Sequence, residues 1–112
     1  MRKRLVLLGI LSLIAGHTAG AAEVWHSGTL KSVYPSANGD FVIIFDVDSA
    51  SCTGGGPGKF HHVTVGQNGV TADGSKKIYA LMLAAMMSRN PVSIAFDDSS
   101  GACYVNRASI HN

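Results

Sequence analysis

The N-terminal segment of the chain sets the compartment and the length of the part that folds. Residues 2–4 are basic, residues 5–15 are almost entirely apolar, and Ala19-Gly20-Ala21 has the small residues that signal peptidase requires. The segment predicts a signal peptide over residues 1–21 and a single domain over 22–112, in a secreted or periplasmic protein. Because a membrane-spanning helix needs about 20 apolar residues, this run is too short for an anchor, and we expect no membrane span.

The charge of the predicted mature part argues against nucleic acid as a partner. Three of the nine basic residues lie in the leader, so residues 22–112 carry six basic and seven acidic residues, a formal charge of −1. The largest basic cluster left is Lys76-Lys77. Since nucleic-acid binding needs clustered positive charge, we expect no nucleic-acid partner.

The chain has two cysteines, Cys52 and Cys103. In an oxidising compartment such a pair is typical of a disulfide, and two free buried thiols are the alternative. Closing a loop of about fifty residues stabilises a fold by roughly 4 kcal/mol in the chain-entropy account. A domain of about ninety residues buries a modest share of its surface, so it needs this kind of reinforcement.

Hydrophobic periodicity predicts a mainly β chain with one helix. The expected strands cover residues 24–34 with a bend at Gly28, 41–48, 60–65, 92–96 and 103–110, and the expected helix covers 75–88. Three strands, a helix and two strands is the order β-β-β-α-β-β of the OB-fold, a five-stranded, partly open barrel. An open antiparallel sheet with one helix packed on its face has the same order and is the alternative.

The sequence contains no motif that predicts catalysis. The glycine run before Lys59 departs from the Walker pattern, because Thr53 and Phe60 occupy positions that need Gly and Ser or Thr. No serine or cysteine nucleophile lies in a recognisable catalytic motif. The carboxylates at strand ends are explained by turns more simply than by acid–base catalysis or calcium binding; they are Asp46, Asp48, Asp97 and Asp98. We therefore expect a protein that is not an enzyme and has no cofactor.

We also expect no metal site. The adjacent His61 and His62 point to opposite faces if they lie on a strand, so they cannot hold one ion together. Zinc would require His26 or His111 to converge on a cysteine that the disulfide already uses. We expect one of the two adjacent histidines to be partly buried and the other to be solvated.

Aromatic residues and the helix are the candidate interaction sites. Trp25, Tyr34 and Tyr104 combine an apolar ring with a polar edge, which suits both sugar rings and protein partners. For Trp25, packing in the core is the alternative. The predicted helix is apolar nearly all the way round, so we expect Met82, Met86 and Met87 to contact other subunits of a homo-oligomer. The alternative is a helix sunk between the sheet and its own loops.

With its leader, cysteine pair and strand order, the chain resembles the small secreted OB-fold proteins related to AB5 toxin B subunits, and in layout those of the subtilase cytotoxin type. The resemblance lies in the segments 25–28, 41–48 followed by Cys52, 76–87, and 92–96 followed by Cys103. It implies a pentamer with central helices and binding of a cell-surface glycan. We therefore expect a secreted binding module that recognises a glycan or another cell-surface ligand. A monomeric periplasmic module that binds or inhibits a partner protein is the alternative.

Overall fold

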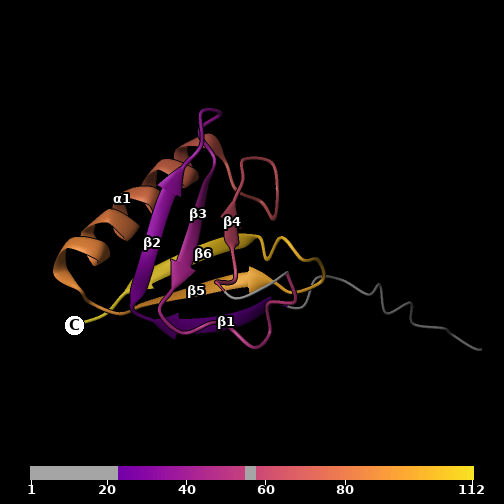
Figure 1. Ribbon diagram of the computed structural model, residues 1–112. Coiled ribbons are helices and arrows are strands. Elements are labelled where there is room, and N and C mark those ends of the chain that lie inside the picture. The colour runs from indigo at the N-terminus through magenta and orange to yellow at the C-terminus, as the bar shows by residue number, and fades with distance from the viewer. Residues whose placement is uncertain (1–22, 55–57) are drawn as a thin grey trace, which may run out of the picture.

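The computed structural model describes residues 23–54 and 58–112 (Figure 1). The elements are β1 (Glu23–Gly28), β2 (Leu30–Pro35), β3 (Phe41–Phe45), β4 (His61–Val63), α1 (Ala72–Ser88), β5 (Val92–Asp97) and β6 (Val105–Ile110). The mainly β architecture with one helix is confirmed, and the helix follows the strand expected over 60–65. The predicted signal peptide over residues 1–21 and the middle of the glycine run, residues 55–57, lie outside the described residues.

The strands form two antiparallel sheets of three strands, ordered β1-β5-β6 and β2-β3-β4. The strand expected over 24–34 is therefore two strands, because the chain bends after Gly28 and passes from one sheet to the other. A Cβ atom on Gly28 would lie 3.3 Å from the ring of Phe45, so a glycine suits this close approach. Over the described residues the two sheets do not close into one barrel.

Three strands are shorter than their sequence patterns predict. The strand expected over 41–48 ends at Phe45, and Val47, which lies within the expected range, is exposed. The strand expected over 60–65 is reduced to three residues in β4. The last strand begins at Val105, because Cys103 has a φ of 47°, a left-handed conformation that an extended strand does not allow.

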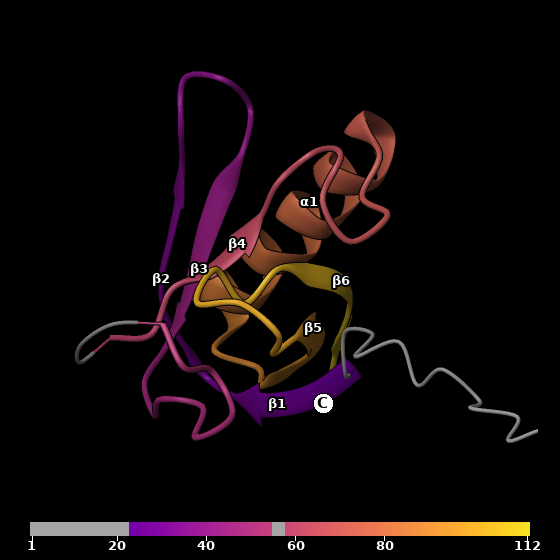
Figure 2. The same cartoon turned by 90° about the vertical axis from the view of Figure 1, so that its right-hand side faces the viewer.

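One hydrophobic core lies between the two sheets and the helix (Figure 2). The alternation in β3 sends Phe41, Ile43 and Phe45 into this core. The other buried members are Leu30, Cys52, Val63, Val70, Met82, Ala85, Val92, Ile94, Phe96, Cys103 and Val105. Every element except β1 supplies a fully buried side chain, so the core ties both sheets to the helix.

Helix α1 begins three residues before its predicted start and contacts β2 and β6, one strand from each sheet. Thr71 is its N-cap, and the Thr71 hydroxyl accepts a hydrogen bond from the backbone N–H of Gly74 at 3.0 Å. At its other end Arg89 takes a left-handed conformation with φ 60°, and the chain then continues to Pro91. No helix of the described residues is long and apolar enough to cross a membrane.

The disulfide between Cys52 and Cys103 is confirmed, with 5.8 Å between the two Cα atoms. It joins the loop that follows β3 to the segment that precedes β6. Both cysteines are buried, so the bond is part of the core that links the two sheets.

Candidate ligand-binding face

The outer face of the β2-β3-β4 sheet is the candidate site. Antiparallel register places Tyr34 opposite Val42 and Val42 opposite His62, so these three side chains form one row across the sheet. Alternation along β3 puts Val42 and Ile44 on this face, because their neighbours point into the core. The row therefore belongs to the face that the helix and the other sheet leave uncovered (Figure 1).

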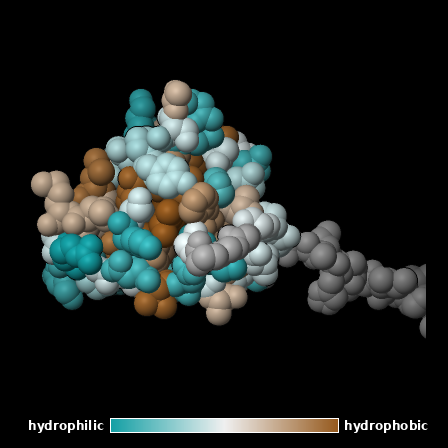
Figure 3. All heavy atoms as spheres, viewed as in Figure 1, coloured by the Kyte–Doolittle hydropathy of each residue, from teal (hydrophilic) through white to brown (hydrophobic). Residues whose placement is uncertain are grey.

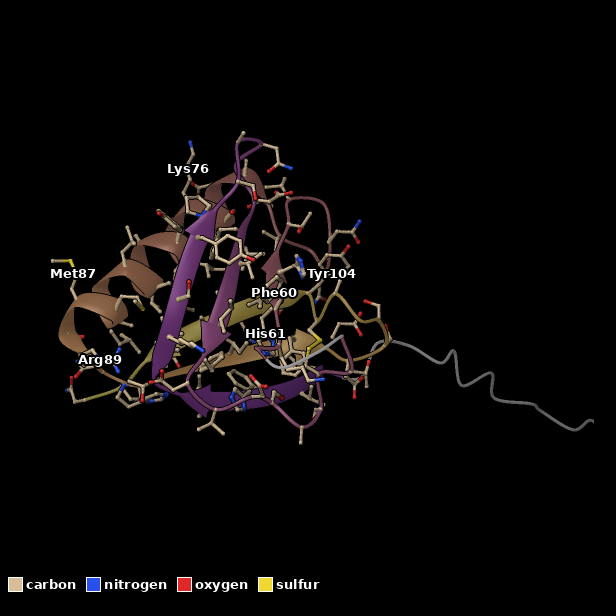
Figure 4. All side chains as sticks on the ribbon, in the orientation of Figure 1. Phe60, His61, Lys76, Met87, Arg89 and Tyr104 are labelled. Atoms are coloured by element: carbon tan, nitrogen blue, oxygen red, sulfur yellow. A yellow bond between two sulfur atoms is a disulfide. The ribbon has the colours of Figure 1, made fainter. Side chains whose placement is uncertain are left out.

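Four aromatic side chains follow this row; we call Tyr34, Phe60, His62 and Tyr104 the aromatic strip. The rings of Tyr34 and Phe60 lie edge to face, 5.8 Å between centroids. His62 continues the contact, with its centroid 6.3 Å from Phe60 and 6.3 Å from Tyr104. Tyr34 is 38% exposed and Phe60 is 43% exposed, which leaves ring surface for a ligand. Figure 4 shows Phe60 and Tyr104 near the same end of β4.

The surroundings of the strip are apolar at the centre and polar at the rim. In the space-filling view hydrophobic residues gather in the middle of this side of the molecule, and hydrophilic residues surround them (Figure 3). Val42 is only 6% exposed although it lies on the outer face, because it stands between Tyr34 and His62 in the row. The face is thus a shallow apolar surface bordered by polar groups, and no deep cleft is needed to reach it.

Hydrogen bonds hold the strip at the β4 end. The Nδ1 atom of His62 lies 2.8 Å from the carbonyl oxygen of Ala102, and the backbone N–H of His62 donates to the same oxygen at 3.2 Å. The side-chain amide of Asn68 donates to the carbonyl oxygen of Tyr104 at 2.8 Å. Since the disulfide also anchors the residue before Tyr104, these rings are positioned before any ligand binds.

Asp48 fixes the chain just before Phe60. Its carboxylate accepts hydrogen bonds from the backbone N–H groups of Gly58 at 3.0 Å and of Lys59 at 3.1 Å. These hydrogen bonds lower the pKa of Asp48, so the carboxylate stays charged and keeps the loop end in place at neutral pH. The Asp48 carboxylate thus holds the segment that leads into Phe60.

The structure brings together two of the three predicted ligand-binding residues. Tyr34 and Tyr104 belong to the strip, whereas Trp25 lies on β1 in the other sheet. Trp25 is 53% exposed, so it is not a core residue, and the guanidinium of Arg107 lies 5.3 Å from its ring centroid. Arg107 also pairs with Glu23, so Trp25 belongs to a separate, more charged surface.

The predicted oligomer residues divide between core and surface. Met82 is 0% exposed and packs in the core, so its expected contact with another subunit is wrong. Met86 is half-buried against the core. Met87 is 89% exposed and points away from the protein, and Leu83 is 41% exposed on the same helix (Figure 4).

Beneath the strip, His61 points inward and packs against the disulfide. Its ring centroid lies 4.7 Å from that of Phe96 and 5.6 Å from that of Phe45. Burial, with a smaller effect of the neighbouring histidines, lowers the pKa of His61 from 6.5 to about 4, so the imidazole is neutral. The adjacent histidines differ in burial as expected, but each is more buried than predicted, with His61 fully buried and His62 half-buried.

The predicted carboxylate group does not assemble into one site. Asp46 pairs with Arg89 at 3.3 Å, and Asp97 accepts a hydrogen bond from the backbone N–H of Ser99 at 2.7 Å. Among the described residues, one group has the spacing to hold a metal ion: Cys52, His61 and Cys103. His111, one of the two histidines that a zinc site would have required, lies 2.9 Å from the hydroxyl of Ser93 through its Nε2 atom.

Sequence reasoning missed Phe60 and His62 as members of the site. The available signal was the alternation of residues 60–65, which puts Phe60 and His62 on the face opposite to His61 and Val63. That pattern shows that they share a face, but it does not show that Tyr34 and Tyr104 lie beside them.

No protein-family model, curated protein or solved structure matches the chain.

Proposed function

We propose that the chain is an exported, non-enzymatic binding module that recognises a glycan through the aromatic strip. The observation that carries the proposal is the continuous contact of four aromatic side chains on an open sheet face. Sugar rings present flat apolar C–H surfaces that stack on aromatic faces, while the phenol oxygens at the ring edges hydrogen-bond to hydroxyl groups. A shallow, pre-positioned strip suits such a ligand.

The charge of the chain favours a glycan over a nucleic acid. Binding of single-stranded nucleic acid on an aromatic surface also needs a positively charged groove for the phosphates. Residues 22–112 have a formal charge of −1, and Arg107 and Arg89 are both paired with carboxylates. A neutral oligosaccharide needs no such cations.

We also propose that the fold is a distorted OB-fold. In an OB-fold of this kind β1 and β2 are one bent first strand. Its first half pairs with β5, and its second half pairs with β3. The proximity of β4 and β6 and the hydrogen bond from the His62 N–H to the carbonyl of Ala102 join the remaining edges. OB-folds bind oligosaccharides on the face of their second and third strands and on the loop before the last strand. In this chain His62 lies on the third of these strands, Phe60 directly precedes it, and Tyr104 lies in the loop before the last strand.

We propose that the chain forms a homo-oligomer in which exposed apolar residues of α1 contact one another. The resemblance to AB5 toxin B subunits favours a pentamer. Met87 and Leu83 are the residues that support it, because a large exposed methionine on a helix is a candidate contact. Light scattering at micromolar concentration tests the assembly. A strict monomer would remove the oligomer and favour the alternative of a monomeric partner-binding module.

The experiment for the glycan is an array of immobilised oligosaccharides probed with the domain 22–112 purified in its oxidised form. We expect hits that Phe60→Ala and Tyr34→Ala abolish. The matched control is Trp25→Ala, which removes a more exposed aromatic residue from the other sheet and should leave binding unchanged. Loss of binding in Trp25→Ala alone would move the site to β1, and a folded protein with no hits would contradict the glycan proposal.

A further inference from the structure

The disulfide and His61 form a buried cluster that the proposed binding function does not use. Cys52 and His61 are each 1% exposed, and Cys103 is 0% exposed. A ring nitrogen of His61 and the two sulfur atoms all lie within 4.8 Å of one another. The three residues come from the loop after β3, from β4 and from the segment before β6. The fold thus brings one nitrogen and two sulfur atoms, the usual zinc ligands, to one point.

The two ring nitrogens of His61 are buried and have no hydrogen-bond partner. Buried polar atoms in folded proteins nearly always have a partner, so this pair needs an explanation. The rings of Phe45 and Phe96 that surround the imidazole offer none. A nitrogen lone pair that faces two sulfur atoms in an apolar site is available to a metal ion.

We propose that, when the Cys52–Cys103 disulfide is reduced, Cys52, Cys103 and His61 bind one Zn²⁺ ion. Reduction by a dithiol transfers two electrons and two protons to the two sulfur atoms, and the dithiol becomes a disulfide. Zn²⁺ then displaces the two thiol protons to the solvent and accepts electron pairs from two thiolates and one imidazole nitrogen. The ion takes the place of the covalent link between the two sheets.

The charge of the site selects a divalent ion. Two thiolates, a neutral imidazole and Zn²⁺ make a neutral centre, whereas a monovalent ion would leave a net negative charge in an apolar interior. His26 is a candidate fourth ligand, because its ring stacks on His61 with 6.1 Å between centroids. Its Nε2 atom now lies 2.9 Å from the carbonyl oxygen of Val47, so ligation through that atom would require this contact to open.

The test compares the oxidised chain with the chain reduced by a phosphine, which is oxidised to its oxide and does not compete for zinc. We expect the reduced chain to take up one Zn²⁺ in competition with a chromophoric chelator, and Co²⁺ in its place to show thiolate-to-metal charge-transfer absorption. Because loss of an outer-shell partner alone costs about 10–100-fold, loss of a ligand should weaken binding at least about 100-fold. The oxidised chain should therefore bind Zn²⁺ at least that much more weakly.

Variants identify the nitrogen ligand. His61→Phe fills the same space without a nitrogen and should weaken zinc binding to the reduced chain at least about 100-fold. The control His62→Ala should leave zinc binding unchanged. The comparison of oxidised with reduced wild type remains decisive if His61→Phe does not fold. If reduction unfolds the chain, Zn²⁺ should restore the circular dichroism spectrum of the folded protein. The proposal would be overturned if the oxidised and reduced chains bound Zn²⁺ equally well, or if His61→Phe bound it as tightly as the wild type. It would also be overturned if Zn²⁺ failed to restore the circular dichroism spectrum of a reduced, unfolded chain.

Discussion

Acid should lower the unfolding free energy of this protein through the buried side chain of His61, as the pH falls from 6.5 to about 4. In the unfolded chain His61 takes up a proton below its ordinary pKa of 6.5, whereas in the folded protein burial lowers the pKa to about 4. Between these values the unfolded state binds more protons, so stability rises with pH and is lost as the pH falls. The stability that depends on a neutral His61 is therefore fully present above pH 6.5 and is lost by about pH 4.

The size of this effect follows from the two pKa values. At 1.36 kcal/mol for each pH unit, the interval from 6.5 to about 4 corresponds to about 3 kcal/mol of unfolding free energy. Solvent does not reduce this free energy, because His61 is only 1% exposed. For a domain of this size about 3 kcal/mol is a large share of the total stability.

The assay is urea unfolding of the oxidised protein at several pH values between about 4 and 6.5, followed by circular dichroism. His61→Leu removes the imidazole and should remove about 3 kcal/mol of the pH dependence, while carboxylates contribute equally to both proteins. Its stability at neutral pH should equal or exceed that of the wild type, because a buried polar group without partners is lost. The control His62→Leu keeps His61 and should retain the acid sensitivity. Parallel loss of stability in wild type and His61→Leu would refute the reasoning.

Three further predictions concern the disulfide, the helix and the loops. Cys52→Ala opens a link of sequence separation 51 and should lower the unfolding free energy by about 4 kcal/mol; an unchanged urea midpoint would contradict this. Met82→Lys should prevent folding because it puts a charge in the core, whereas Met87→Lys should keep the circular dichroism spectrum and dissociate any oligomer seen by light scattering. Gly54→Ala should lower the melting temperature, since its Cβ would overlap the carbonyl group of Gly101; an equal melting temperature would show that the loops move apart.

Much of the local structure is predictable from the sequence because it depends on neighbouring residues. The alternation of Phe41, Ile43 and Phe45 identifies a buried strand face, and the change of period identifies the helix. The N-cap is a local feature too, because the Thr71 hydroxyl accepts its hydrogen bond from Gly74, three residues later. The positions where strands end were less predictable, because they depend on which strand pairs with which.

The helix shows where sequence periodicity stops being sufficient. Residues 81–87 are apolar on nearly all sides, so periodicity alone does not say which side faces the core. Packing against β2 and β6 buries Met82 and exposes Met87. Of the three methionines predicted to contact other subunits, Met82 is therefore a core residue and Met87 is exposed.

By itself the sequence determined the mainly β composition, the single helix, the one pairing open to the two cysteines and the buried face of the strand that contains Phe41, Ile43 and Phe45. These features follow from local periodicity and from there being one possible cysteine pair. The tertiary structure decided which exposed rings meet and what surrounds His61. Tyr34, Phe60 and Tyr104 come from separate segments, and the pairing of β2, β3 and β4 together with the loop before β6 brings them to one face. Such contacts between distant residues depend on the packing of the whole chain, which no local pattern encodes.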